Sequence, residues 1–239
     1  MDLTTGGWIL AASFDPKRSH ELALIRLGQY LKGTLKDGMI LEPMKLDQFQ
    51  MDVWVDSDFM GVYGKERRDD PDNVKSRTGC VVTLNGCPVV WKSTLQDSIC
   101  KPTMMAEYYA LSTAMREVIP LRNLVKEVAN ALGINEMCNT KFKCTAHEDN
   151  SACETLTNLE PGRVTPRSRF YDVRVHWFGS LLSDKPPDVI KVVRVDTKSQ
   201  LGDMHTKPLN REDFERLRNL LIGWQLVMHF LFCSSGRQC

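Results

Sequence analysis

Glu107 lies where a carboxylate is unexpected, inside the apolar stripe of a predicted helix. It follows Met104 by three residues and precedes Leu111 by four. A buried carboxylate without a partner costs on the order of several kcal/mol or takes up a proton. Glu107 therefore requires a counter-charge or a metal ion.

Three more acids lie at or just beyond the ends of predicted strands. Asp56 ends one apolar strand, Asp149 follows another, and Asp203 lies in the first turn of a short helix after a third. An open mixed sheet would gather such positions at one edge. Four carboxylates without a nearby set of His or Cys are typical of a site for a hard cation, Mg²⁺ or Mn²⁺. Two such ions roughly 4 Å apart can activate a water and stabilise the leaving oxygen of a phosphodiester. Taken singly, each aspartate is more often a solvated surface residue or a helix cap.

Five strands are predicted from β-rich runs, over residues 51–59, 78–84, 88–92, 142–146 and 189–195. Asn85-Gly86 between the second and third runs is a strong signal for a tight hairpin.

Helices are predicted over residues 19–31, on both sides of Pro120, over 151–159 and 170–182, and near the C-terminal end. Pro120 is expected to separate two helices, because its ring lacks an N–H and obstructs the preceding turn. The order of strands and helices predicts an α/β (α+β) fold with a mixed sheet flanked by helices.

Charge and composition exclude several classes of protein. With 26% charged and 42% hydrophobic residues, the 239-residue chain resembles neither a disordered nor a fibrous protein. The 31 Lys and Arg residues nearly balance the 30 Asp and Glu residues, so any basic surface for nucleic acid must be local. The most apolar stretch, residues 220–233, is shorter than the roughly 17–25 residues of a membrane helix.

None of the eight cysteines forms a CxxC pair, which disfavours zinc-finger and thioredoxin-like sites. With no basic segment typical of a signal peptide at the start, we expect reduced thiols and an intracellular location.

A local basic segment spans residues 161–175 and contains a single acid, Asp172. Its guanidinium groups suit the phosphates of a nucleic acid, although a solvated basic face is an equal alternative. The candidate phosphate contacts are Arg163, Arg167, Arg169 and Arg174.

Six stretches occur in a characteristic order: residues 55–59 (VDSDF), 76–80 (SRTGC), 88–93 (PVVWKS), 106–112 (AEYYALS), 149–152 (DNSA) and 197–209 (TKSQLGDMHTKPL). Together they resemble the ribonuclease H domain of copia-type retrotransposon Pol polyproteins. The segment 16–34 resembles the end of the reverse transcriptase that precedes this domain in the family.

The resemblance implies a ribonuclease H-like fold, a five-stranded mixed sheet with helices on both sides. It also implies endonucleolytic hydrolysis of the RNA strand of an RNA–DNA hybrid, with two Mg²⁺ or Mn²⁺ ions. Carried over by position, the catalytic and metal-binding acids are Asp56, Glu107, Asp149 and Asp203. Asp58 is the alternative to the first of these and Glu148 a weaker alternative to the third.

Gln96 and Asn150 are implied contacts to the shallow minor groove of the hybrid and its 2′-hydroxyls. A role in a turn or a helix cap is the favoured alternative for both.

The resemblance divides the chain into three parts. Residues 1–50 would be a remnant of the reverse transcriptase C-terminal or connection region, 51–223 the ribonuclease H-like domain, and 224–239 a tail outside the match. The expected partners are the hybrid and the upstream reverse transcriptase domain, without a membrane or a small-molecule cofactor. Because the polymerase's paired aspartates are absent, no polymerase activity is expected. The resemblance makes the cytoplasm, virus-like particles or the nucleus the expected location.

The sequence departs from the family pattern at Phe170, where the family has a histidine, and at Pro120, where a tryptophan is common. These departures leave open a decayed transposon remnant that acts at most as a nucleic-acid-binding module. An integrase-like strand-transfer enzyme is a third reading, disfavoured by the ending Thr206-Lys207-Pro208-Leu209.

Overall fold

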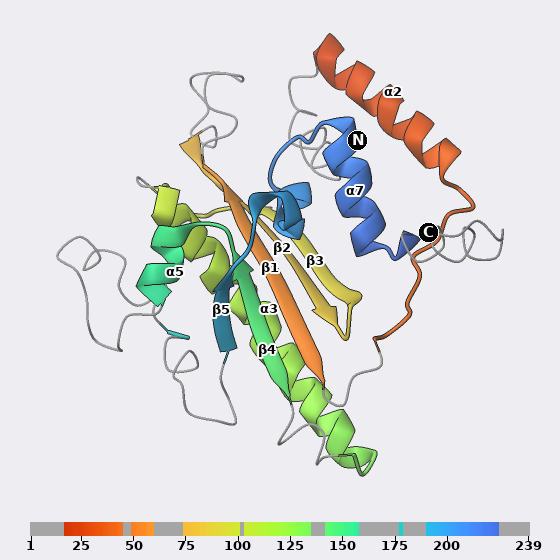
Figure 1. The fold of residues 1–239 in the computed structure, drawn as a ribbon. Helices are drawn as coiled ribbons and strands as arrows, with labels where there is room; N and C mark the ends of the chain where they lie inside the picture. Colours follow the sequence, from red (N-terminus) through yellow and green to blue (C-terminus); the bar gives the residue numbers. More distant parts are fainter. Residues whose placement is uncertain are drawn as a thin grey trace, which may run out of the picture.

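One five-stranded sheet organises the chain in a computed structural model, which describes residues 17–44, 49–59, 74–100, 103–134, 142–157, 177–178 and 190–224. The strands are β1 (Gln50–Asp58), β2 (Arg77–Leu84), β3 (Cys87–Leu95), β4 (Lys143–Glu148) and β5 (Ile190–Arg194). Their order is β3-β2-β1-β4-β5 (Figure 1). The β1–β2 and β2–β3 pairs are antiparallel, whereas β4 is parallel to both β1 and β5. The predicted α/β class and mixed sheet are confirmed.

Helices cover both faces of this sheet. The long helix α3 (Thr103–Ala131) crosses one face, and α5 (Ser151–Thr157) lies beside it near β5 (Figure 1). The other face carries the 3₁₀ helices η5 (Thr197–Ser199) and η6 (Leu201–His205), followed by α7 (Arg211–Leu221).

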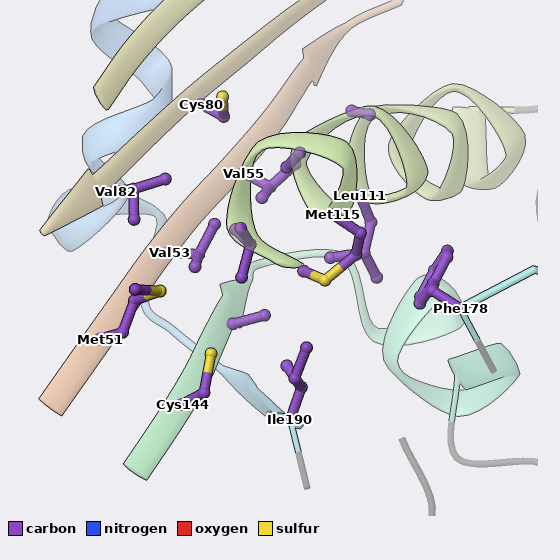
Figure 2. Packing of buried hydrophobic residues seen from close by; sticks show 14 of the residues in the cluster. Met51, Val53, Val55, Cys80, Val82, Leu111, Met115, Cys144, Phe178 and Ile190 are labelled. Atoms are coloured by element: carbon purple, nitrogen blue, oxygen red, sulfur yellow. The ribbon is translucent and has the colours of Figure 1, made fainter. Parts of the chain in front are cut away.

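The main core fills the space between α3 and the sheet. Figure 2 shows Val53 and Val55 of β1 facing Leu111 and Met115 of α3, with Phe178 at the edge of the cluster. All five side chains are fully buried. Apolar residues on alternate strand positions therefore attach α3 to the sheet.

The predicted hairpin is confirmed at Asn85-Gly86. Both residues have positive φ, 47° and 82° respectively, which a tight two-residue turn between antiparallel strands requires. This turn fixes the register in which β2 pairs with β3.

The prediction of separate helices on the two sides of Pro120 is wrong, because α3 runs through Pro120 without a break. Pro120 has no N–H to donate to the backbone carbonyl of Arg116, four residues earlier. Both residues are exposed, so water can reach this carbonyl. A proline inside a helix costs about 3 kcal/mol, and full burial of an apolar side chain is worth about 1.5–3 kcal/mol. Burial of Met115 and Val118 against the sheet offsets much of that cost.

The predicted N-terminal helix is confirmed as α2 (Arg18–Gly33), and none of its residues is buried. It meets α7 through Tyr30 and Phe214, whose ring centroids are 5.8 Å apart. Of the helix predicted over 170–182, only residues 177 and 178 lie within the described part of the chain. The described helices include none with the length and apolar character to cross a membrane.

Candidate metal centre

Three of the predicted acids meet at one end of the sheet. Asp56, Glu107 and Asp149 each place a carboxylate oxygen within 4.8 Å of the others; we call these three residues the acidic group. Asp56 lies near the end of β1, and Asp149 directly follows β4, the parallel neighbour of β1. Glu107 comes from the first turns of α3, so two strand ends and one helix supply the three carboxylates.

Burial makes this arrangement electrostatically costly. Asp56 is 1% exposed and Glu107 is 4% exposed. Burial raises the pKa of Glu107 to about 10, and repulsion from Asp56 and other nearby carboxylates adds to the rise. Burial also raises the pKa of Asp56, although Lys207 and Thr206 oppose the rise. A divalent cation would favour the charged forms and release protons as it binds.

The fourth predicted acid, Asp203, is linked to the acidic group through a lysine. Lys207 Nζ lies 2.9 Å from Asp203 Oδ1 and 3.5 Å from Asp56 Oδ1. Burial, followed by repulsion from Asp56, raises the pKa of Asp203 to about 7. Burial alone would lower the pKa of Lys207, but the two aspartates raise it above its ordinary value.

Two glycines allow η6 to approach the end of β1. A Cβ atom at Gly202 would lie 2.9 Å from both the backbone N and the Cβ of Asp56. A Cβ atom at Gly79 would lie 2.8 Å from the backbone O of Gly202 and the Cβ of His205. Any larger residue at these positions would push Asp203 and its helix away from Asp56.

Polar contacts hold η6 in this position. Gln200 donates from Nε2 to Val55 O at 2.9 Å, and its Oε1 accepts from Gly202 N at 3.1 Å. The Thr206 hydroxyl donates to Asp56 Oδ2 and so orients that carboxylate.

Sequence reasoning assigned no role to Thr206 or Lys207, although both lie in one of the stretches that carry the resemblance. A usable signal was the spacing of Lys207 four residues after Asp203, which places two charges together on one helical turn. Nothing in the local sequence indicated that Thr206 reaches Asp56.

The geometry favours the first choices over the two alternatives. Glu148 is fully buried and its Oε1 accepts from Asn150 N at 3.1 Å, outside the acidic group. Burial raises the pKa of Glu148 to about 8, with repulsion from Asp149 as a further cause. Asp58 is opposite Arg77 in the β1–β2 pairing and likewise lies outside the group.

The residues predicted to contact nucleic acid are placed differently. Gln96 is 2% exposed, and its Nε2 donates to Thr78 Oγ1 at 3.1 Å and to Ala106 O at 2.9 Å. These bonds tie the β2–β3 hairpin to α3, so the geometry supports a structural role instead of contact with a hybrid. Asn150 Oδ1 accepts from the backbone N of Ala152 and Cys153, which makes Asn150 the N-terminal cap of α5.

The four arginines of the basic segment, Arg163, Arg167, Arg169 and Arg174, lie outside the described residues. Their contact with phosphates stays a prediction.

No family model matches the chain. It is 28% identical over 210 residues to the Pol polyprotein from transposon TNT 1-94 of Nicotiana tabacum, covering 87% of this chain and 14% of that protein. It is 26% identical over 200 residues to the polyprotein from transposon RE1 of Arabidopsis thaliana, a match that covers 84% of this chain and 12% of that protein. The Gag-Pol polyprotein of transposon Ty1-DR5 of Saccharomyces cerevisiae is 26% identical over 182 residues, a match that covers 70% of this chain and 10% of that protein.

These relatives are Pol polyproteins of copia-type transposons, and the predicted resemblance is thereby confirmed. The chain spans between 10% and 14% of their length. Among solved structures, LC11-RNase H1 isolated from compost is 12% identical, with a TM-score of 0.37, over 76% of this chain and 99% of that one.

Proposed function

We propose that this chain, a relative of copia-type Pol polyproteins, is a metal-dependent ribonuclease H that cleaves the RNA strand of an RNA–DNA hybrid. The observation that carries the proposal is the meeting of Asp56, Glu107 and Asp149, which come from three separate elements. Gathering three carboxylates, two of them buried, is unfavourable for a structural site and favourable for one that binds cations.

The donor set fits the implied ions. Carboxylate oxygens are the preferred ligands of Mg²⁺ and Mn²⁺, and Glu107 Oε2 has no hydrogen-bond partner within the described part of the chain. Asp56, Glu107, Asp149 and Asp203 would hold two ions. When bound, the ions would supply an activated water and stabilise the leaving oxygen of the phosphodiester.

The remaining steps belong to the chain's own residues. Thr206 keeps the Asp56 carboxylate in a fixed orientation through its hydroxyl. Glu107 gives up its proton when a cation binds, because a nearby positive charge favours the ionised form. Gly202 keeps η6, and with it Asp203, against the end of β1.

The test is cleavage of a hybrid with a labelled RNA strand, in Mg²⁺, in Mn²⁺ and in chelator, beside single-stranded RNA. The critical variant is Asp56→Asn, which keeps the shape of the side chain and removes its charge. Asp52→Asn is the matched control, because Asp52 is a buried acid of the same strand that pairs with His147 at 3.0 Å, outside the acidic group. Melting curves establish that both variants fold.

We expect the wild type and Asp52→Asn to cut only the RNA strand of the hybrid, and only with metal, whereas Asp56→Asn does not cut. Cleavage by Asp56→Asn at the wild-type rate would refute the site. A folded wild type that binds the hybrid without cutting it would instead support a decayed remnant that retains nucleic-acid binding.

A further inference from the structure

The ammonium group of Lys207 lies between two of the four candidate metal ligands. Its Nζ is 2.9 Å from Asp203 Oδ1 and 3.5 Å from Asp56 Oδ1, and the side chains of these aspartates are 8% and 2% exposed. The Lys207 side chain is 36% exposed, so it reaches inward from the protein surface. A lysine in this place neutralises carboxylates that would otherwise repel one another.

The backbone holds Lys207 in this position. The Lys207 N–H donates to Asp203 O at 3.2 Å, which closes a helical turn and puts both side chains on one side of it. Thr206, the preceding residue, is itself anchored to Asp56 by its hydroxyl. The ammonium is therefore placed by the same segment that delivers Asp203.

Lys207 distinguishes the Asp56–Asp203 pair from the acidic group. Asp56, Glu107 and Asp149 each have an oxygen close enough to the others to share an ion. By contrast, Asp56 Oδ1 and Asp203 Oδ1 both face the Lys207 ammonium. A divalent ion shared by these two aspartates would need oxygens that the lysine already engages.

We propose that Lys207 is an internal counter-ion that competes with a divalent cation on the Asp56–Asp203 side of the site. This inference rests on the proposed function for the identity of the metal site. One ion binds among Asp56, Glu107 and Asp149 while the lysine stays in place. An ion between Asp56 and Asp203 binds more weakly, because the ammonium must leave first. Lys207 is thus a positioning residue that keeps the two aspartates ordered when metal is scarce.

The test is a titration of the whole chain with Mn²⁺, followed by calorimetry and by thermal melting, with no nucleic acid present. Lys207→Met removes the charge and retains most of the side-chain length. Lys198→Met is the matched control, because Lys198 is an exposed lysine of η5 that makes no ion pair with these acids among the described residues. Calorimetry gives the Kd of each ion, and melting gives the stability with and without metal.

We expect Lys207→Met to tighten the weaker Mn²⁺ Kd about tenfold, because it removes a competing positive charge at close range. Without metal, the Tm of Lys207→Met should lie at least about 2–4 °C below the wild-type Tm. Addition of Mn²⁺ should raise the Tm of Lys207→Met by more than it raises the wild-type Tm. Lys198→Met should match the wild type in both measurements. An unchanged or weaker Mn²⁺ affinity in Lys207→Met would overturn the inference.

A measurement on the wild type covers the case in which Lys207→Met does not fold. The rate of reductive methylation of each lysine, read by mass spectrometry, should rise at Lys207 when Mg²⁺ is added and stay constant at Lys198. A rate at Lys207 that is unchanged or lower with Mg²⁺ would refute displacement of the ammonium.

These readouts separate the inference from the proposed function. If Mn²⁺ binds the wild type and Lys207→Met equally, only the competition is wrong. If neither protein binds Mn²⁺, the acidic group is not a metal site, and both proposals fall.

Discussion

The apolar core under α3 and two members of the acidic group, Asp56 and Glu107, come from the same two elements and are buried to nearly the same degree. Val55 and Asp56 are successive residues of β1, and Glu107 lies one helical turn from Leu111 in α3. Their exposed fractions differ by only a few per cent. Burial stabilises the fold at the first of these regions and opposes it at the second.

The difference between the two regions lies in what burial removes from water. Transferring an apolar side chain such as Leu111 out of water is favourable by about 1.5–3 kcal/mol. Transferring the Glu107 carboxylate is unfavourable, which is why its pKa rises to about 10. The core therefore supplies the stability that holds the acidic group together.

The largest effect is expected from Glu107→Gln, which alters the acidic group and leaves the core intact. Single-turnover cleavage of the hybrid in Mg²⁺ should fall about a thousandfold or more, because a ligand charge for the ions is lost. Glu117→Gln is the control on the same helix, since Glu117 pairs with Lys92 at 2.6 Å, away from the acidic group. If Glu107→Gln cleaved the hybrid at a rate within tenfold of the wild type, the distinction between a catalytic acidic group and a structural core would be contradicted.

Leu111→Ala tests the core without touching a carboxylate. The free energy of unfolding, measured in urea, should fall by about 2–5 kcal/mol, because the substitution leaves a cavity against the sheet. Cleavage per folded molecule should change by no more than a few-fold. Leu124→Ala, at an exposed position of α3, should change stability by less than about 0.5 kcal/mol. A similar small loss at Leu111 would show that the core packing is not as described.

The pH dependence of stability separates the two regions further. In the unfolded chain Glu107 loses its proton near its ordinary pKa of 4.5, whereas in the folded chain its pKa is about 10. The folded state therefore binds more protons between these values, and without metal the stability falls as the pH rises through this window.

Glu107→Gln should remove this contribution. At pH 9 in chelator, urea unfolding should show the variant to be more stable than the wild type by about 1–3 kcal/mol, with the difference shrinking toward pH 5. Mg²⁺ should reverse the order. If the two proteins had the same pH profile in chelator, Glu107 would not be buried as a proton-binding carboxyl group.

The smallest effect is expected from Asn150→Ala, next to the acidic group. Loss of the α5 cap should lower the unfolding free energy by about 1 kcal/mol, and Asn150→Ser should retain most of it. Hybrid affinity, measured as Kd in chelator, should be unchanged in both variants if Asn150 acts as a cap alone. An equal loss of hybrid affinity in Asn150→Ala and Asn150→Ser would instead support the predicted contact with nucleic acid.

Much of the fold could be predicted from the sequence because its signals are local. The hairpin at Asn85-Gly86 follows from residues that accept positive φ, and alternation or helical spacing of apolar residues marks the strands and α2. The placement of Asp56 and Asp149 at neighbouring strand ends could also be predicted, since it needs only a sheet in which these strands are adjacent. Glu107 was identifiable because a charge inside an apolar stripe is exceptional.

Other features depend on residues far apart in the chain, and no local pattern encodes them. The local cost of Pro120 predicts a break in the helix, whereas the burial that offsets this cost comes from packing against the sheet. The sequence leaves Gln96 between a contact to the hybrid and a role in a turn or cap, because its bonds to Thr78 and Ala106 exist only after the hairpin meets α3.

The same physical reason applies to the completed site. Thr206 and Asp56 are 150 residues apart in sequence, and their contact requires that η6 pack against β1. Spacing within the segment brings Lys207 to Asp203, but only the close approach permitted by Gly202 brings the lysine to Asp56. Local spacing thus specified the elements and most of the acids, while long-range packing determined which charges meet.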